Sequence, residues 1–376
     1  MAWAFAVALL TVGAAAGQNA LPAKKAAGKI HSKIRNQGGV PLKKALPNAA
    51  DPLAKPAPAK GQEKDKEKDV PAPGTFHYKF KMTVFDGTVL NTHYYPSRLG
   101  TTAPVVLMVH EKDSSGKVFE DPIPDLKGRG LAEYLQSQNY AVLIPDLRGH
   151  GANPRRSLSP KDWALMVDDL QACYQFLLDR HNRGELNVAK LGILALGEGA
   201  NLAAAWLALP GGAVASEGRV SDASALALIS PLADGEGFRL NQVMAQLANR
   251  VPVLLMVGEK DQVSSDPVHA AAPTVKRTGG NKVELKPSSL HGYKLLKLEP
   301  GVTSDLSKFF DGTVKYKSSD WEPRYNLNPV AYIDIEIVRH TDKAPAPEPK
   351  KEAEAPKAKE KEKEKAKDAA KKGEAP

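Results

Sequence analysis

The sequence predicts an α/β fold, in which a mostly parallel, twisted sheet has helices on both faces and an antiparallel hairpin at its N-terminal edge. Two observations predict it. Between residues 76 and 312, continuous apolar runs of strand length alternate with amphipathic segments of helix length, which is typical of parallel strands covered on both faces. Near the start of this region, Asp86-Gly87 joins two β-rich segments, a strong signal for a tight hairpin turn.

The elements follow in order along the chain. We expect strands at 76–84, 89–95, 104–110, 140–147, 190–196, 225–230, 251–257 and 283–286, because these runs are apolar and rich in β-branched residues. We expect helices at 125–138, 161–182, 199–209, 240–248, 267–277 and 303–310, because apolar residues recur there at helical spacing. The region after the strand at 225–230 holds no insertion long enough to form a lid domain.

The ends of the chain differ in composition from this central domain, which we place at 74–312. Residues 1–16 form a short apolar run that closes on three alanines, which predicts a signal peptide and export to the periplasm or the exterior. Residues 17–73 and 343–376 are rich in Lys, Ala and Pro and lack apolar periodicity, so we expect a disordered linker and tail. Residues 313–342 form an extension in which 330–338 alternates like an added edge strand.

The charge distribution limits the classes of partner. Residues 17–73 carry 12 Lys and Arg against 5 Asp and Glu, whereas residues 74–340 carry 29 of each sign, so the basic excess describes the tails. An anionic polymer of the cell envelope is therefore one expected partner of the linker. The lysine runs are mixed with acids and lack interleaved aromatics, which argues against nucleic acid, and no stretch is long enough for a transmembrane span.

Three kinds of site are not expected. The single cysteine, Cys173, cannot form an intramolecular disulfide. The chain has no Cys/His cluster at zinc-ligand spacing and no Gly-rich phosphate loop. We therefore expect no metal and no cofactor.

The strongest functional signal is the turn after the apolar strand at 190–196. The letters ALGEG at 195–199 stand between this strand and a helical pattern, as in the nucleophile elbow of G-x-S-x-G hydrolases, but the position of the serine holds Gly197. Shifting the register by one residue would place Glu198 at the tip and Leu196 where a small residue is needed, so we favour Gly197. Glycine relieves the backbone strain of the tip and removes the nucleophile.

Three further motifs make residues 76–312 resemble an α/β-hydrolase-fold protein. The letters PDLRGHG at 145–151 resemble the turn after the fourth strand of that family, GEKD at 258–261 resembles its acid-bearing turn, and LHG at 290–292 resembles its histidine loop. The order of elbow, acid and histidine also matches. The small size and missing lid resemble the dienelactone-hydrolase and short serine-peptidase-like branches.

The resemblance implies roles for single residues. His291 would be the catalytic base and Asp261 the acid that orients it, or the two would only form a hydrogen-bonded latch between loops. The usual His-Gly pair of the oxyanion loop reads His110-Glu111, which places a carboxylate where negative charge develops, unless Lys112 neutralises it. Dienelactone hydrolases also carry Glu in this loop. Glu198 completes the expected oxyanion region.

Two functions follow from these roles. In the first, the protein is an exported, degenerate hydrolase that acts by binding or scaffolding, with an ester-like or peptide ligand in the relict pocket. In the second, it is an active ester, lactone or peptide hydrolase that uses His291 and Asp261 with a displaced nucleophile. The candidates for that nucleophile are loop residues near the expected site: Glu198, Ser114, Ser115, Ser230, Ser264, Ser265, Ser288 and Ser289.

Overall fold

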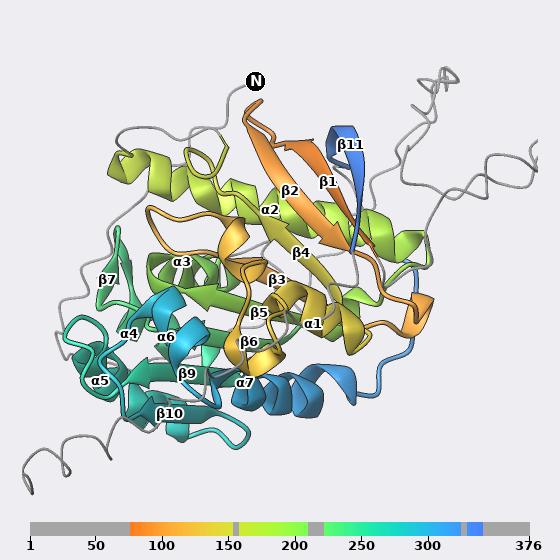
Figure 1. The fold of residues 1–376 in the computed structure, drawn as a ribbon. Coiled ribbons are helices and arrows are strands. Elements are labelled where there is room, and N and C mark those ends of the chain that lie inside the picture. Colours follow the sequence, from red (N-terminus) through yellow and green to blue (C-terminus); the bar gives the residue numbers. More distant parts are fainter. Residues whose placement is uncertain (1–75, 153–157, 210–221, 325–328, 341–376) are drawn as a thin grey trace, which may run out of the picture. The chain divides into compact units, whose positions relative to one another are not determined.

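The computed structural model describes residues 76–152, 158–209, 222–324 and 329–340. Its main sheet contains these strands: β1 Phe76–Thr83, β2 Val89–Tyr95, β3 Val105–Val109, β4 Ala141–Pro145, β5 Leu191–Leu196, β6 Ala223–Ile229, β9 Val253–Gly258, β10 Lys282–Lys286 and β11 Ala331–Arg339. The spatial order is β10-β9-β6-β5-β3-β4-β2-β1-β11 (Figure 1). The predicted signal peptide, linker and tail lie outside the described residues.

The sheet is parallel from β10 to β4 and antiparallel from there to β11, as predicted. The hairpin of β1 and β2 stands at the predicted place, and β11 pairs with β1 through the register Phe76↔Arg339 to Thr83↔Ala331. A separate pair of two-residue strands, β7 Asp234–Gly235 and β8 Phe238–Arg239, follows β6.

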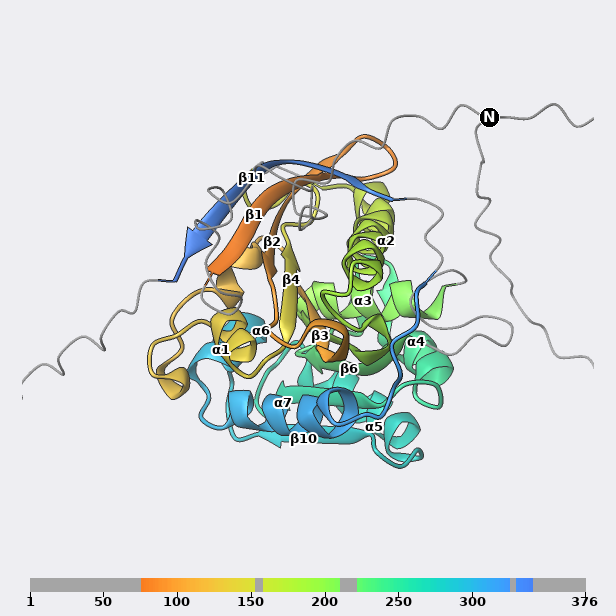
Figure 2. The same cartoon turned by 90° about the vertical axis from the view of Figure 1, so that its right-hand side faces the viewer.

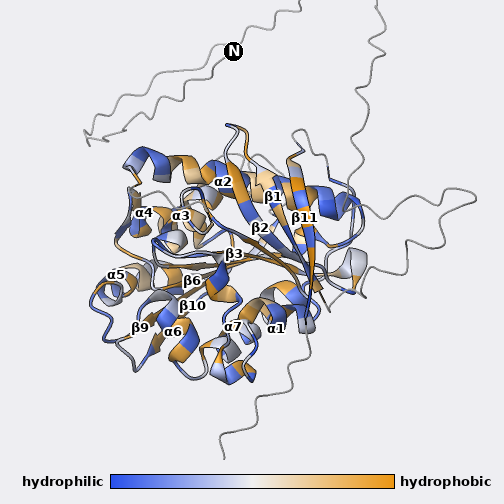
Figure 3. Cartoon of the chain, turned by 45° about the horizontal axis from the view of Figure 1, so that its top comes forward, coloured by the Kyte–Doolittle hydropathy of each residue, from blue (hydrophilic) through white to orange (hydrophobic). Residues whose placement is uncertain are grey.

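Helices cover both faces of the sheet. They are α1 Leu131–Ser137, α2 Pro160–Asn182, α3 Gly197–Ala208, α4 Leu240–Leu247, α5 Ser265–Lys276, α6 Gly292–Leu298 and α7 Val302–Phe310. The apolar sides of α2, α3, α4 and α5 pack into one core, and those of α1, α6 and α7 pack into a second core on the opposite face (Figure 2). Figure 3 shows that the central strands are mainly hydrophobic, whereas outer helices such as α2 and α5 carry both hydrophobic and hydrophilic residues.

One predicted helix needs correction, and one observed helix was not predicted. The helix expected at 125–138 begins only at Leu131, because Lys127 and Gly128 have φ of 58° and 77° and turn the chain after a short 3₁₀ turn at Pro124–Leu126. The helix α6 was not predicted, since its seven residues are too few to show a clear period. Within the described part of the chain, none of the helices has the length and apolar character that crossing a membrane requires.

A buried ion pair holds the loop after β4 in place. The backbone N–H and the guanidinium of Arg148 donate to the carboxylate of Asp169 on α2, with N···O distances of 2.6 to 2.9 Å, and Arg148 Nη1 donates to Asp86 in the β1–β2 turn at 2.7 Å. Burial raises the pKa of Asp169 to about 6, although Arg148 favours the charged carboxylate. This side chain therefore fastens the loop to a helix and to the hairpin.

We predict that Arg148→Met lowers the free energy of unfolding by about 3–5 kcal/mol, because it leaves a buried carboxylate without its counter-charge. Urea denaturation measures the change. The matched control is Lys81→Met, which breaks the exposed ion pair between Lys81 and Asp334 and should change the free energy by less than about 1 kcal/mol. Equal effects of the two changes would contradict the anchoring role.

Candidate active site

Gly197 stands at the corner where β5 ends and α3 begins. Its φ is +51°, in the left-handed region that glycine adopts without strain. A Cβ atom at this position would lie 3.7 Å from His291 Nε2 and 2.8 Å from the Cβ of Glu111. A side chain at 197 would thus face the imidazole, but Glu111 already fills the adjoining space.

His291 and Asp261 come together from the loops after β10 and β9. His291 Nδ1 donates to Asp261 Oδ2 at 2.8 Å, and the Asp261 side chain is buried, whereas that of His291 is 34% exposed. The backbone N–H groups of Val263 and Ser264 donate to Asp261 Oδ1 at 3.0 and 3.3 Å, which fixes the carboxylate. With Nδ1–H directed at Asp261, the lone pair of the neutral ring lies on Nε2 and faces the corner at Gly197.

The Glu111 carboxylate is held beside this corner. Its Oε2 accepts from the Tyr293 N–H at 3.1 Å, and a Cβ atom on Gly292, whose φ is +49°, would overlap the same oxygen. Burial raises the pKa of Glu111, although the Tyr293 N–H and the nearby His291 oppose this shift. Only glycine at 292 allows the carboxylate to lie so close to the histidine loop.

His110, the residue before Glu111, fixes the backbone of this loop. Its Nδ1 donates to the Glu111 carbonyl oxygen at 2.7 Å, and its Nε2 accepts from the Leu147 N–H at 3.1 Å. Burial lowers the pKa of His110 to about 3, so the ring is neutral at pH 7 and can play both parts. The fully buried His110 side chain thus fixes the backbone position of Glu111.

Glu198 and Lys112 form a second contact at the same place. Glu198 Oε2 accepts from the backbone N–H of Lys112 at 3.2 Å, while Lys112 Nζ pairs with Glu236 in the turn between β7 and β8. The bond with Glu236 is the main cause that raises the pKa of Lys112. The ammonium group of Lys112 thus pairs with Glu236 rather than with Glu111.

Three of the serines considered as displaced nucleophiles are engaged elsewhere or contact the other ring nitrogen, and the hydroxyl of a fourth, Ser230, is buried without a hydrogen-bond partner among the described residues. Ser264 Oγ lies 3.4 Å from His291 Nδ1 and donates to the Ser230 carbonyl at 2.9 Å, and Ser265 Oγ donates to the Glu259 carbonyl at 2.9 Å. Ser288 Oγ accepts from the Leu290 N–H at 3.2 Å. In the described ranges, no hydroxyl or carboxylate makes a hydrogen bond to His291 Nε2.

Sequence reasoning missed two features of this part of the molecule. The bond from Lys112 N–H to Glu198 joins residues 86 positions apart, and no motif signals it. A cluster of His77, His93 and Glu120 could hold a metal ion, although the sequence led us to expect no metal. The three residues follow no zinc-motif spacing, so only the folded chain reveals the cluster.

The comparisons with known proteins agree with this architecture. A family model described as serine aminopeptidase, S33, matches residues 127–249. An acylaminoacyl peptidase of Pyrococcus horikoshii has 13% sequence identity and a TM-score of 0.50, over 66% of this chain and 43% of that one. This likeness shows the fold alone. No curated protein matches the chain.

Two further solved structures are similar at lower scores. An esterase of Pyrococcus furiosus has 17% identity and a TM-score of 0.49, over 64% of this chain and 93% of that one. A dienelactone hydrolase of Anabaena variabilis has 17% identity and a TM-score of 0.42, over 63% of this chain and 95% of that one.

We predict that Gly197→Ala lowers the free energy of unfolding by about 1–3 kcal/mol, because the new Cβ meets both the positive φ and the Cβ of Glu111. Adding Glu111→Gly should recover the part that comes from the contact. Urea denaturation of the single and double variants measures both parts. Gly279→Ala is the control, since a Cβ there meets nothing within 4 Å; a loss at 197 no larger than at 279 would count against the crowded corner.

Proposed function

We propose that this chain, which has the α/β-hydrolase fold, has lost serine-hydrolase catalysis and acts by non-covalent binding or scaffolding after export. The observation that carries the proposal is Gly197, which stands where a side chain would face His291 Nε2 and has none. Without a nucleophile the imidazole has no hydroxyl to deprotonate, and loss of the nucleophile from such a site costs about 10⁶-fold in turnover.

The oxyanion side supports the same proposal. In this fold the oxyanion hole consists of the N–H of the residue after the nucleophile and an N–H from the loop after β3. Here the loop N–H of Lys112 donates to the Glu198 carboxylate at 3.2 Å, so one donor is already engaged by an anion. The carboxylates of Glu111 and Glu198 would raise the energy of an oxyanion formed beside them.

The same groups favour a particular kind of ligand. The His291 side chain is 34% exposed, and its Nε2 can accept a hydrogen bond from an N–H or O–H group. Two carboxylates nearby disfavour anionic ligands and favour neutral or cationic ones. Of the two ligands expected from the resemblance, a peptide with free N–H donors therefore fits this corner better than an ester that lacks such donors.

The competing function, an active hydrolase with a displaced nucleophile, finds no supporting contact. Ser264 is the serine whose hydroxyl hydrogen-bonds to the imidazole in the described residues, and it contacts Nδ1, the nitrogen already directed at Asp261. Glu198 is bonded to the Lys112 N–H. Neither group is placed to pass a proton to Nε2.

We predict that the protein is not labelled by a fluorophosphonate probe and gives no burst with an activated ester. Labelling of one site per chain would contradict the proposal. In the variant Gly197→Ser/Glu111→Gly, which supplies a hydroxyl and removes the side chain that crowds it, we expect labelling and slow ester hydrolysis.

Two controls accompany this experiment. Gly197→Ser alone should stay inactive, because the serine Cβ would lie 2.8 Å from that of Glu111. Adding His291→Ala to the double variant should abolish the activity again, since the serine then lacks its base. Activity that survives His291→Ala would show that this corner is not a relict triad.

We further propose that the basic linker at 17–73 attaches the exported protein to an anionic envelope polymer. Its excess of seven positive charges supports an electrostatic attachment. Sedimentation with vesicles that contain lipopolysaccharide should show binding at about 50 mM salt and release at about 500 mM, because salt screens exposed charges. A chain without residues 17–73 should not bind at either salt concentration. Release that does not depend on salt would contradict the attachment.

A further inference from the structure

A cluster of metal-binding side chains lies at the antiparallel end of the sheet. His77 is on β1, His93 is on β2, and Glu120 follows the 3₁₀ turn Gly116–Phe119. The register Tyr78↔Tyr94 sets His77 opposite Tyr95, and His93 is two residues further along the same face of β2. One ligand atom from each of His77, His93 and Glu120 lies within 4.8 Å of the others.

The hydrogen bonds of the cluster leave one buried nitrogen without a partner. Glu120 Oε1 accepts from His93 Nδ1 and, at 2.6 Å, from the Tyr95 hydroxyl. His77 Nε2 is buried and makes no hydrogen bond, since Glu120 Oε1 lies 3.7 Å away. A buried polar atom left in this way costs free energy, and a bound cation would satisfy it.

We propose that His77, His93 and Glu120 bind a divalent transition-metal ion, with Zn²⁺ as the fitting member of that class. Two imidazoles and one carboxylate are a ligand set that zinc accepts, with a fourth position left for water. Tetrahedral zinc holds its ligand atoms about 3.4 Å apart, so the widest separation in the cluster must close by about 1.4 Å. Rotation of the partly exposed His93 and Glu120 side chains supplies this movement.

The surroundings of two of the three ligands, His77 and Glu120, shift their pKa values. Burial is the main cause that lowers the pKa of His77 to about 3, so its imidazole is neutral at pH 7. Burial alone would raise the pKa of Glu120, but the bonds and charges of His93, Tyr95 and His77 lower it to about 2. The carboxylate is thus ionised. Binding therefore needs no proton release from either of these groups at neutral pH.

Neighbouring side chains orient the ligands. His340, just after β11, lies with its Nε2 3.1 Å from His77 Nδ1, which directs the other nitrogen of His77 at the cluster. The Tyr95 hydroxyl orients the Glu120 carboxylate, and the Tyr95 ring stacks on His77 with centroids 4.4 Å apart. Such outer partners are the usual support of a metal-binding histidine and carboxylate.

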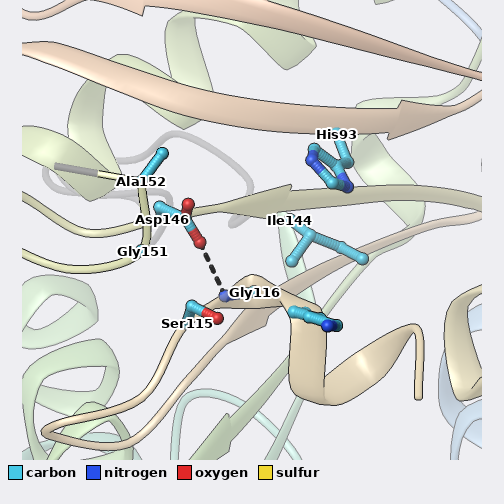
Figure 4. A pocket seen from close by; sticks show the side chains of 8 residues that line it. His93, Ser115, Gly116, Ile144, Asp146, Gly151 and Ala152 are labelled. Atoms are coloured by element: carbon cyan, nitrogen blue, oxygen red, sulfur yellow. Dashed lines mark hydrogen bonds between the residues drawn. The ribbon is translucent and has the colours of Figure 1, made fainter.

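A pocket beside the cluster gives the metal a route of entry. Its volume is about 320 Å³, and His93 lines it together with Lys117, Asp146 and Gly151 (Figure 4). Asp146 is turned to the Gly116 N–H at 2.7 Å and so belongs to the pocket wall. Of the three proposed ligands, His93 is the one that lines this cavity.

The test is Zn²⁺ binding by the full chain, after removal of metal with a chelator and without a histidine tag. We expect one Zn²⁺ per chain by competition with a chromophoric chelator, and a higher melting temperature when Zn²⁺ is added. Glu120→Gln and His93→Gln should each weaken binding by at least ~100-fold and remove the shift in melting temperature. Tyr95→Phe, which loses only an outer hydrogen bond, should weaken binding by about 10-fold.

The control is His269→Ala, an exposed histidine on α5, which should leave binding unchanged. The melting temperatures of the metal-free variants report whether each one folds, and Glu120→Gln keeps the shape of the side chain. Binding that is absent in the unaltered chain, or that survives both ligand changes, would show that the cluster is a hydrogen-bonded network only and would overturn the proposal. None of these outcomes depends on whether the His291 corner is catalytic.

Discussion

The close packing of the loop after β3 against the β5–α3 corner and the histidine loop is the constraint on which the rest of the site depends. A Cβ on Gly199 would overlap the His110 carbonyl, one on Gly292 would overlap the Glu111 carboxylate, and one on Gly197 would lie 2.8 Å from the Glu111 Cβ. Glycine at 197 and glutamate at 111 therefore depend on each other sterically. The Glu111 side chain occupies the space beside position 197, and it can do so because Gly197 has no Cβ atom.

The groups that position His291 are separate from the corner at Gly197. The acid–histidine pair rests on the loops after β9 and β10, and its 2.8 Å bond needs nothing from the elbow. The ion pair between Arg148 and Asp169 likewise holds the loop after β4, and the hydrogen bonds that form it involve neither the elbow nor the acid–histidine pair. A fold built in this way keeps its histidine oriented whether or not a nucleophile is present, since backbone N–H groups and buried carboxylates do the positioning.

The sequence carried enough information for the fold and for the corner, but not for the contacts across it. Apolar runs such as 190–196 and the turn at Asp86-Gly87 are local signals, so their strands could be predicted. The predicted start of α1 was wrong because Lys127 has a positive φ, which the amino-acid composition does not reveal. Only loop packing brings the Glu198 carboxylate to the Lys112 N–H. Strand register and loop packing likewise bring His77 close to His93 and Glu120. Such pairings have no period or motif to reveal them.

The strand β11 also settles how the sheet ends. Without it, β1 would present a row of unpaired N–H and C=O groups, the usual template for edge-to-edge aggregation. The new edge strand, β11, is irregular and so pairs poorly with a further strand. Its register with β1 shifts between Lys79 and Lys81, and Asp334 has a φ of 55°. The opposite border, β10, begins and ends with lysine. The C-terminal extension thus pairs the backbone groups that β1 would otherwise expose at the edge of the sheet.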